Sequence, residues 1–592
     1  MQTITKALTD IVTAAFVKCG YPEASGVVTP SDRLDLCQFQ CNGAFAAAKA
    51  YRKAPIAIAS EVAEVLSSEE IFAKAEAVKP GFLNLTLSDE YMLSLAAGID
   101  SDKFCGVPQA DKQEKIVIDY GGPNVAKPLH IGHLRSAIIG ESLKRLARAC
   151  GCTVYSDVHL GDWGLQIGLV IAELSERYPD WKCFSEDFKE SDGVPPLSAE
   201  LLCEVYPFAS KKSKEDEAFR EAAMEATSQL QAGRRGYRAL LEHILNVSVT
   251  DLKKNYDNLN VSFELWKGES DAQPYIPDMV QMMKDKGYAY MSDGALVVDV
   301  AEETDTKEIP PCIILKSDGA SLYSTTDLAT IVMRMQDYHP DSIIYLADQR
   351  QSMHFIQVFR CARKTGIVDD SVELKHIGFG TMNGKDGKPF KTRDGGVMRL
   401  EYLLDEINEE MLKKITENQK EKENLDISDE EAKKTAKMVA LAAVKYGDLS
   451  NQASKDYVFD IERFTSFEGN TGPYILYTIV RIKSILKKYT AKNSLPDAPI
   501  LGAHSASEKN LMLVLSRFNA MMENAYEEKA PHKICAYIYE LANAFNGFYH
   551  ETKILSEEDF KVQASYIGLL VLTKNILETC INVLGFSAPD RM

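Results

Sequence analysis

The chain has 592 residues, of which 45% are hydrophobic and 26% charged, and its formal net charge is −19. This length exceeds what one hydrophobic core normally spans, so we expect about two to four domains of ordinary globular composition. An acidic chain is a poor non-specific ligand of nucleic acid, because phosphate contacts need Lys and Arg, although local basic surfaces can still serve one specific RNA.

The N-terminal segment lacks the charged, apolar and small-residue regions of a signal peptide. No apolar run approaches the roughly 18–20 residues that a membrane span needs. The twelve cysteines are scattered, and the close pairs Cys37/Cys41 and Cys150/Cys152 lack zinc spacing. The sequence therefore predicts a cytoplasmic protein with no membrane association, no structural zinc and no disulfides.

Residues 1–105 form the first expected domain. Apolar residues from Ile4 to Ala15 keep helical spacing, and the segment 80–87 is a turn followed by strand-like alternation. This pattern predicts a small α+β domain.

Residues 106–455 form the second expected domain. Residues 115–120 are a short apolar strand, a Gly/Pro loop follows, a long helix begins at about Leu129, and 152–155 is the next strand. This β-loop-α-β order predicts a Rossmann-like, doubly wound α/β fold. Residues 183–290 are more polar and helical and are expected to be an insertion. Residues 313–315 and 342–346 are expected strands where the α/β pattern resumes.

Residues 456–592 form the third expected domain, an all-α bundle. Pro531 occupies the first position of a helix whose apolar residues run from Ile534 to Phe548. A second amphipathic helix is expected over 511–522. The highly charged stretch 413–430 is expected to be a solvated helix or arm.

The segment Pro123–His133 joins the first strand to the long helix of the second domain. A helix start offers unpaired N–H groups and a positive dipole end, which suits phosphate. His130 and His133 share one face of the first turn, and Gly132 lets an adenine approach the backbone. This context predicts adenylyl transfer from ATP. Solvated surface histidines, or a small-molecule nucleotidyltransferase, are the alternatives.

A second cationic segment, residues 384–396, holds four positive charges and four glycines. Its composition predicts a loop that closes on departing pyrophosphate, with a solvated hairpin as the alternative.

Together these motifs resemble the class I aminoacyl-tRNA synthetases, and the arginyl-tRNA synthetase family in particular. Residues 123–136 are similar to the family's ATP signature, known as the HIGH motif, and residues 159–168 are similar to its next motif. Residues 323–327, 467–474 and 588–592 also fit, so the resemblance runs from about residue 30 to the end of the chain.

The second family signature is normally Lys-Met-Ser-Lys-Ser, and its equivalent here is Pro389–Arg393, with Thr392 in place of the second lysine. The resemblance implies that Lys391 and Arg393 act in catalysis and that Lys127 supplies the missing charge. The alternative for Lys127 is a solvated loop lysine. The implied ATP-binding residues are His130, Gly132, His133, Lys127, His159, Gly161, Asp162 and Lys391.

Arginine's guanidinium is planar, always charged and rich in donors, so its pocket needs carboxylates. The resemblance implies the arginine-binding set Asp119, Asn124, His133, Tyr323, Asp327 and Gln351. The family often has Glu where Asp119 stands. Asp327 has helix capping as an alternative, Tyr323 has packing, and His159 has a structural role.

Phe39, Gln40 and Asn42 combine an aromatic with amides, which can stack on and read an unpaired RNA base. The resemblance implies tRNA contacts there, with a core role as the alternative for Phe39. It also makes the helix bundle an anticodon-binding domain, in which Tyr474, Tyr477 and the C-terminal Met592 approach the tRNA and Arg481 pairs with phosphate. Core packing is the alternative for the two tyrosines.

The sequence therefore predicts a monomeric ligase that uses ATP with Mg²⁺, L-arginine and tRNA(Arg). Its catalytic residues are expected to be His130, His133, Lys127, Lys391 and Arg393. Three other assignments stay open: another class I synthetase, an adenylyltransferase, or a non-catalytic RNA-binding paralogue.

Overall fold

The computed structural model describes residues 3–31, 33, 36–110, 113–127, 129–388, 399–421, 428–496 and 499–592. The chain forms two compact units. Unit 1 contains Met1–Gln109, Glu421–Tyr446 and Thr465–Met592, and unit 2 contains Ala110–Lys420 and Gly447–Phe464. Lys391 and Arg393 lie outside the described residues.

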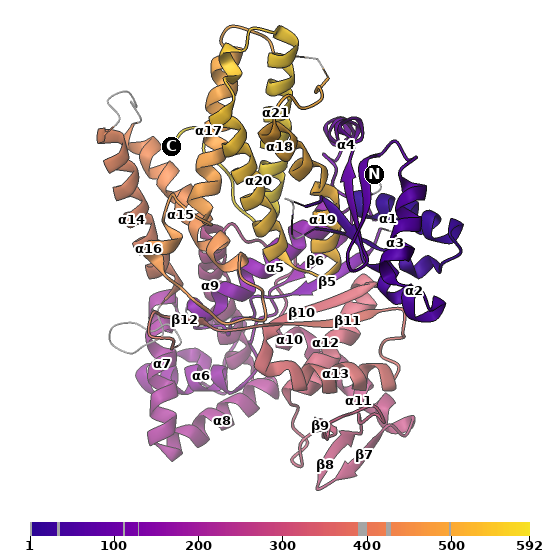
Figure 1. The fold of residues 1–592 in the computed structure, drawn as a ribbon. Coiled ribbons are helices and arrows are strands. Elements are labelled where there is room, and N and C mark those ends of the chain that lie inside the picture. The colour runs from indigo at the N-terminus through magenta and orange to yellow at the C-terminus, as the bar shows by residue number, and fades with distance from the viewer. Residues whose placement is uncertain are drawn as a thin grey trace. The chain divides into compact units, whose positions relative to one another are not determined.

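The N-terminal part of unit 1 is an α+β fold, as expected (Figure 1). Its antiparallel sheet has the order β1-β2-β4-β3. The strands are β1 (Val28–Pro30), β2 (Phe39–Cys41), β3 (Phe72–Val78) and β4 (Phe82–Leu87), and the helices are α1 (Ile4–Lys18), α2 (Gly43–Tyr51), α3 (Pro55–Leu66) and α4 (Asp89–Ser101). Leu8, Val12 and Phe16 bury the apolar face of α1 in the core.

The C-terminal part of unit 1 is helical in its described residues, again as expected. Its helices are α17 (Gly472–Thr490), α18 (Ala506–Ser516), α19 (Phe518–Glu527), α20 (Pro531–Glu551) and α21 (Phe560–Val583), together with most of α15 (Asp429–Leu449). Pro531 is the first residue of α20. The single helix expected over 511–522 is wrong, because the helix is interrupted at Arg517 and α19 begins at Phe518.

Helix α21 is long and apolar enough to cross a membrane by length and composition alone. Its most apolar window has a mean hydropathy of 1.2, and 67% of that window is buried inside the fold. The expectation that no apolar segment reaches membrane-spanning length is therefore wrong. Burial in the bundle explains the apolar composition of α21, because a helix that is covered on most sides reads as hydrophobic all round.

Unit 2 is built on a parallel sheet with the order β11-β10-β5-β6. The strands are β5 (Lys115–Asp119), β6 (Thr153–Asp157), β10 (Ser342–Asp348) and β11 (Glu373–Phe379). The chain passes from β5 to β6 on one side and later returns to β10 on the other side. The strand order therefore reverses between β5 and β10, and ligands of open α/β sheets bind at such a switch point.

Helices cover both faces of this sheet (Figure 1). Helix α5 (Leu134–Ala149), preceded by the 3₁₀ turn Ile131–His133, packs on β5, β6 and β10. Helices α12 (Tyr323–Tyr338) and α13 (Ser352–Lys364) share a buried core with Val117 and Ile343. The predicted strand-loop-helix-strand order of residues 115–157 is confirmed.

The expected insertion is helical over most of its length. It contains α7 (Ala199–Glu215), α8 (Glu217–Gln231), α9 (Arg235–Asn258), α10 (Glu269–Ala272) and α11 (Ile276–Asp285), which follow α6 (Leu165–Arg177). A small antiparallel sheet then forms from β7 (Ala289–Ser292), β8 (Ala295–Val298) and β9 (Cys312–Leu315). The strand expected at 313–315 therefore exists, but it pairs with β8 and not with the parallel sheet.

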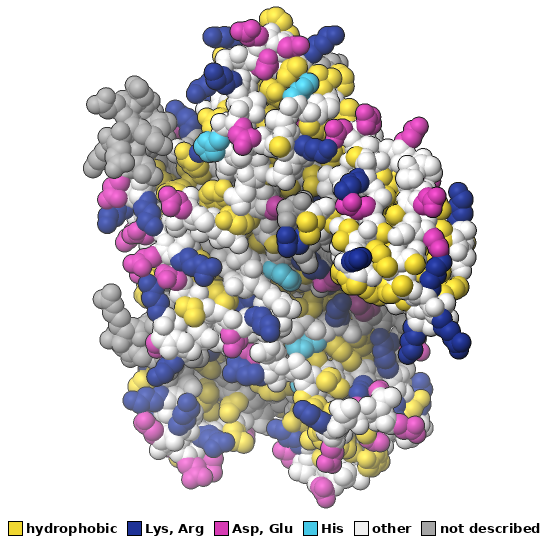
Figure 2. Space-filling model, in the orientation of Figure 1, with side chains coloured by type: hydrophobic (Ala, Val, Ile, Leu, Met, Phe, Trp, Pro, Cys, Tyr) yellow, Lys and Arg dark blue, Asp and Glu magenta, His cyan; other side chains and the backbone are white. Residues whose placement is uncertain are grey.

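The remaining elements of unit 2 follow the sheet. Strand β12 (Met382–Asn383) pairs in parallel with β13 (Tyr457–Val458), and α14 (Leu400–Glu421) and α16 (Ile461–Phe464) are helical. The charged stretch 413–430 is helical at both ends, in α14 and α15, and residues 422–427 lie outside the described part. Acidic and basic side chains are interspersed on the face that Figure 2 shows.

Gly140 illustrates how tightly α5 packs on the end of β5. A Cβ at Gly140 would meet the ring of Tyr120 at 2.2 Å, whereas a Cβ at Gly547 in α20 would meet nothing within 4 Å. We expect Gly140→Ala to lower the thermal unfolding midpoint, because overpacking costs about 1–3 kcal/mol. Gly547→Ala is the matched control, and its midpoint should not fall, since alanine is favoured over glycine in helices by about 1 kcal/mol. Equal midpoints for the two variants would contradict this account of the packing.

Candidate active site

The candidate site of unit 2 is a cavity of about 990 Å³ at the switch point of the parallel sheet. The ends of β5 and β10, the start of α5 and the first turn of α12 all contribute to its wall. Ten of its lining residues were predicted to bind ATP or arginine: Asp119, Asn124, His130, Gly132, His133, His159, Gly161, Tyr323, Asp327 and Gln351. The fold thus brings together residues that are up to 232 positions apart in the sequence (351 − 119).

The two signature histidines lie against each other at the helix start. Their ring centroids are 4.0 Å apart. The backbone N–H of His130 donates to Nδ1 of His133 at 3.2 Å, and the N–H of Gly132 donates to Nδ1 of His130 at 3.0 Å. A Cβ at Gly132 would lie 2.7 Å from the His130 ring, so a larger residue there would push this ring away.

Both histidines are neutral near pH 7. Burial, reinforced by the positive charge of Lys127, lowers the pKa of His130 to about 4. Burial, followed by the charges of His130 and Lys127, lowers the pKa of His133 to about 3. Because both Nδ1 atoms accept hydrogen bonds, the neutral rings carry their protons on Nε2. Each histidine therefore presents an N–H donor, as a phosphate-binding group requires.

The loop before the helix is held by the backbone around Gly161. The N–H of Gly161 donates to the carbonyl of Pro123 at 3.2 Å, and the N–H of Val125 donates to the carbonyl of Gly161 at 3.1 Å. A Cβ at Gly161 would meet Oδ1 of Asn124 at 2.1 Å. The glycine is therefore needed for this close approach, which fixes Asn124 at the cavity wall.

One end of the cavity is lined by the first turn of α12. Tyr323 is 73% exposed, which excludes the packing role considered for it. Asp327 accepts from Nε2 of His354 at 2.5 Å, and the N–H of Leu322 is capped by the Thr325 hydroxyl at 2.9 Å. The capping role considered for Asp327 is therefore wrong, and its carboxylate lies in the cavity wall.

Glu269 is a cavity residue that the sequence did not reveal. It opens α10 and lines the cavity together with Tyr323 and Asp327. Burial, followed by the negative charge of Asp162, raises the pKa of Glu269 to about 7. No ion pair to Glu269 forms among the described residues, and the charge of His159 lowers its pKa less than burial and Asp162 raise it, so this half-buried carboxylate has no direct cationic partner there. Such a group favours a cationic ligand.

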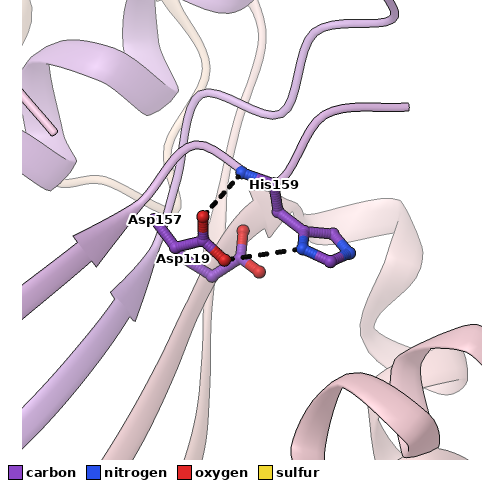
Figure 3. Close-up of side chains that lie close together, drawn as sticks. All are labelled: Asp119, Asp157 and His159. Atoms are coloured by element: carbon purple, nitrogen blue, oxygen red, sulfur yellow. Dashed lines mark hydrogen bonds and ion pairs between the residues drawn. The ribbon is translucent and has the colours of Figure 1, made fainter. Parts of the chain in front are cut away.

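A charged cluster contains the cavity residue Asp119, with Asp157 and His159 beside it (Figure 3). Asp119 and Asp157 are register partners on β5 and β6, and Nη2 of Arg334 donates to both, at 2.6 and 2.7 Å. Nδ1 of His159 lies 3.5 Å from Asp157. Asp119, Asp157 and His159 resemble a metal-binding group. The guanidinium of Arg334 already holds Oδ2 of both carboxylates and brings a fixed positive charge, so the cluster does not fit a metal ion.

The predicted ATP contacts His159, Asp162 and Lys127 do not all lie in the cavity wall. His159 lines the cavity and also lies beside Asp157. Asp162 is 2% exposed, and its carboxylate accepts from the N–H and the hydroxyl of Ser270 at 2.9 and 2.6 Å, which favours a supporting position behind the wall. Lys127 is half-buried, and its charge acts on both signature histidines.

Arg135 lies two residues after the signature residue His133, and its hydrogen bonds hold the start of α5 in place. It is 2% exposed, and its Nη1 donates to the carbonyls of Gly380 and Lys455 at 2.7 and 3.0 Å. Its Nε donates to Asp448 at 3.1 Å. The first turn of α5 is therefore tied to the segments that precede β12 and β13, and the predicted pyrophosphate loop follows β12 in the sequence.

The N-terminal RNA-contacting set is partly wrong. Phe39 is 0% exposed and belongs to the hydrophobic core of unit 1, so it has no free ring face on which a base could stack. Gln40 is half-buried and donates to Oδ1 of Asn84 at 2.9 Å, and Asn42 is exposed. Their RNA contacts remain predictions.

A second cavity, of about 1040 Å³, lies in the bundle of unit 1 and is lined by Tyr477, Arg481 and Met592. The Arg481 guanidinium lies over the Tyr477 ring at 4.8 Å. Tyr474, half-buried, donates to Asn543 at 2.6 Å. Neither tyrosine is a core aromatic, which favours the predicted binding surface over the packing alternative.

The C-terminal segment that carries Met592 is held by two ion pairs. Arg591 forms two hydrogen bonds with Glu431, at 3.0 and 2.6 Å. Lys483 lies 3.6 Å from Asp590 and donates to the carbonyl of Ala588 at 3.3 Å. These contacts place the chain end in the wall of the bundle cavity.

Comparisons with known proteins match nearly the whole chain. Residues 2–87 match the arginyl tRNA synthetase N terminal domain, residues 98–461 the catalytic domain of tRNA synthetases class I (R), and residues 475–592 the DALR anticodon binding domain. The arginine–tRNA ligases of Agathobacter rectalis and Alkaliphilus oremlandii are 68% and 54% identical to the chain, with full coverage of both partners. The crystal structure of arginyl-tRNA synthetase from Plasmodium falciparum matches with a TM-score of 0.84 at 25% identity, again over the full length of both chains.

The chain is a class I aminoacyl-tRNA synthetase by its catalytic domain, and within this class it belongs to the arginyl-tRNA synthetase family. This membership confirms the predicted family, the predicted enzyme class and the predicted fold class of three differently built parts.

We expect the affinity for arginine to follow the ionisation of Glu269. The pKa of about 7 means that the carboxylate is largely protonated below this pH and charged above it. The KM for arginine should therefore fall as the pH rises from about 6 to about 8. In Glu269→Gln, the KM should stay flat across this range and exceed the wild-type value at the upper end at least about tenfold.

Steady-state pyrophosphate exchange against pH measures this effect. Glu303→Gln, which alters an exposed carboxylate, is the matched control and should behave like the wild type. A Glu269→Gln variant that keeps the wild-type pH profile would contradict the assignment.

We expect Arg591→Met to release the C-terminal segment from Glu431. The KM for tRNA should rise severalfold while the KM for ATP stays unchanged, because the Arg591–Glu431 contact lies within unit 1 and the ATP site within unit 2. Aminoacylation kinetics measure both values. Lys433→Met, a change of an exposed lysine on the same helix as Glu431, is the control, and an equal effect of both variants would reject the role of the tail.

Proposed function

We propose that the cavity of unit 2 activates L-arginine with ATP and transfers it to tRNA(Arg). In the first step the arginine carboxylate attacks the α-phosphate of ATP and displaces pyrophosphate. In the second step the 2′-OH of the terminal adenosine attacks the activated carbonyl and releases AMP. The observation that carries this proposal is the coexistence, in one cavity, of a phosphate-binding helix start and the unpaired carboxylate Glu269.

The positions of the side chains support one orientation of the substrates. His130 and His133 offer Nε2–H donors to the triphosphate at the start of α5, where the helix dipole also favours negative charge. Asp327, Glu269 and Tyr323, which line the cavity together, receive the guanidinium. Asp119, next to the loop that carries Asn124, receives the α-ammonium, which leaves the arginine carboxylate beside the phosphates.

Positioning and charge supply most of the rate in this scheme. In-line attack at phosphorus needs little covalent chemistry from the protein, so holding the two reactants together is the main contribution. The Mg²⁺ that accompanies ATP is held by phosphate oxygens and water, since Arg334 already fills the carboxylate cluster at Asp119. No structural zinc is needed.

The selectivity for arginine follows from the same carboxylates. An uncharged amino acid would leave the half-buried Glu269 without a cation, and sites of this kind reject such competitors strongly. A separate editing reaction is therefore unnecessary.

We further propose that three parts of the chain share the work: residues 1–105 and 456–592 contact tRNA, and residues 106–455 catalyse. Gln40, Asn42, Tyr474, Tyr477, Arg481 and Met592 remain the proposed contacts. The protein acts as a monomer in the cytoplasm, without a membrane.

Arginine-dependent exchange between ATP and pyrophosphate, with and without tRNA(Arg), tests the function. We expect exchange with arginine and tRNA, and none with the other amino acids. Exchange with a different amino acid would indicate another synthetase. Exchange that forms an adenylate without any transfer of the amino acid to tRNA would indicate an adenylyltransferase. No exchange at all would indicate a non-catalytic paralogue.

We expect Lys127→Ala to lower the rate of arginine activation far more than it weakens ATP binding. The second signature lacks one lysine, at Thr392, and the charge of Lys127 lies close enough to lower the pKa of both His130 and His133. A cation that acts mainly in the transition state changes kcat more than KM. Single-turnover activation and equilibrium ATP binding give the two quantities.

Lys286→Ala, which alters an exposed lysine at the end of α11, is the matched control and should leave both quantities unchanged. An activation rate of Lys127→Ala equal to that of the wild type would show that Lys127 is only a solvated loop residue.

A further inference from the structure

Arg334 is a buried cation behind the cavity residue Asp119, and the proposed reaction does not use it. Its side chain is 0% exposed, and those of Asp119 and Asp157 are 15% and 1% exposed. A single nitrogen, Nη2, bridges Oδ2 of both aspartates. Of these three residues only Asp119 lines the cavity, so Arg334 and Asp157 stand behind it.

The sheet itself creates the need for this cation. Asp119 and Asp157 are register partners on neighbouring parallel strands, so both carboxylates point to the same face. Two buried carboxylates in such proximity cannot both ionise without a cation, and one would hold a proton. A guanidinium does not lose its proton in proteins, so Arg334 gives both aspartates a fixed cation. Burial raises the pKa of Asp119 and the charge of Arg334 opposes this shift, while the pKa of Asp157 stays below its usual value.

The remaining groups around the cluster agree with a fixed charge. Burial lowers the pKa of His159, but its contact with Asp157 and the charge of Asp119 outweigh burial and raise it to about 9. The Tyr345 ring lies 5.2 Å from the guanidinium of Arg334. The cluster therefore joins two cations with two carboxylates, and it is assembled before any substrate binds.

The hydrogen bond from Arg334 determines which oxygen of Asp119 is still free to bind a ligand. Arginine has two cationic ends, a planar guanidinium and an α-ammonium. A guanidinium binds best to both oxygens of one carboxylate in a forked geometry, whereas an ammonium is satisfied by single oxygens. Oδ2 of Asp119 is occupied by Arg334, and Oδ1 accepts no hydrogen bond from the described residues.

We propose that Arg334 is the positioning residue that sets the direction in which arginine lies in the cavity. Its own guanidinium binds Oδ2 of Asp119 and Oδ2 of Asp157, so a second guanidinium cannot use both oxygens of Asp119. Oδ1 of Asp119 is left for the α-ammonium of the substrate. The guanidinium of the substrate is thereby directed to Asp327 and Glu269. This inference rests on the proposed function, because it concerns the orientation of arginine in that reaction.

If arginine binds in the reverse orientation, a specific kinetic effect is expected. If the cluster lacks its own guanidinium, arginine can also bind with its guanidinium at Asp119 and its carboxylate away from ATP. Nonproductive complexes of this kind lower kcat while total binding is retained. A variant that merely disturbed the fold would instead lose binding sites, and one that merely weakened the contact would raise the dissociation constant.

The test compares Arg334→Gln, which removes the charge, with Arg334→Lys, which keeps a nitrogen cation for the bridge. In Arg334→Gln we expect kcat for pyrophosphate exchange to fall at least about tenfold. The arginine dissociation constant should change less than about threefold, with one site per chain and an unchanged KM for ATP. Arg334→Lys should recover most of the wild-type kcat.

Wild-type kcat in Arg334→Gln, or an Arg334→Lys variant as slow as Arg334→Gln, would overturn the inference. If Arg334→Gln does not unfold cooperatively, Asp157→Asn carries the test. Arg334 then neutralises Asp119 alone, so arginine should bind more weakly while kcat is retained, and wild-type affinity would overturn the inference. Failure of the wild-type enzyme to exchange with arginine would refute the proposed function itself and is therefore distinguishable.

Discussion

Buried negative charge at the switch point of the parallel sheet is the constraint on which the site depends. A carboxylate removed from water must find a cation, take up a proton or destabilise the fold. Arg334 supplies the cation for Asp119 and Asp157, and His354 supplies a partner for Asp327. Glu269 forms no ion pair with the described residues, and burial, followed by the charge of Asp162, raises its pKa. The cavity wall thus contains a carboxylate without a cationic partner, and bound arginine supplies that partner.

The parallel sheet explains why chemistry from distant segments meets at one place. The ends of β5 and β10 open the cavity, the helix start at His130 provides the phosphate donors, and α12 brings both Tyr323 and Asp327 to its wall. Two buried arginines then fix the arrangement. Arg135 holds the start of α5 to backbone carbonyls near Gly380, and Arg334 holds the end of β5 to the end of β6.

Local patterns in the sequence were sufficient for most elements and for the phosphate-binding turn. Strand β5, helix α5 and the Pro531 helix start follow from apolar spacing and from turn residues, which act over a few positions. Glu269 carries no such signal, because it lies in a polar segment and gains its role only from packing beside α12. Arg334 looks like a solvated residue of an amphipathic helix until the aspartates that it bridges are placed next to it. The prediction for Phe39 was wrong although its local pattern was suggestive. An aromatic beside amides fits RNA stacking, but in β2 the Phe39 ring points into the core.

Proton release on arginine binding tests the central claim most directly. Titration calorimetry at pH 7 in buffers of different ionisation enthalpy measures the number of protons exchanged per arginine bound. Because Glu269 has a pKa of about 7 and must be charged in the complex, arginine should displace about half a proton, and Glu269→Gln should abolish most of this release. Binding without proton exchange, or with proton uptake, would contradict the account of a cavity built around an unpaired carboxylate.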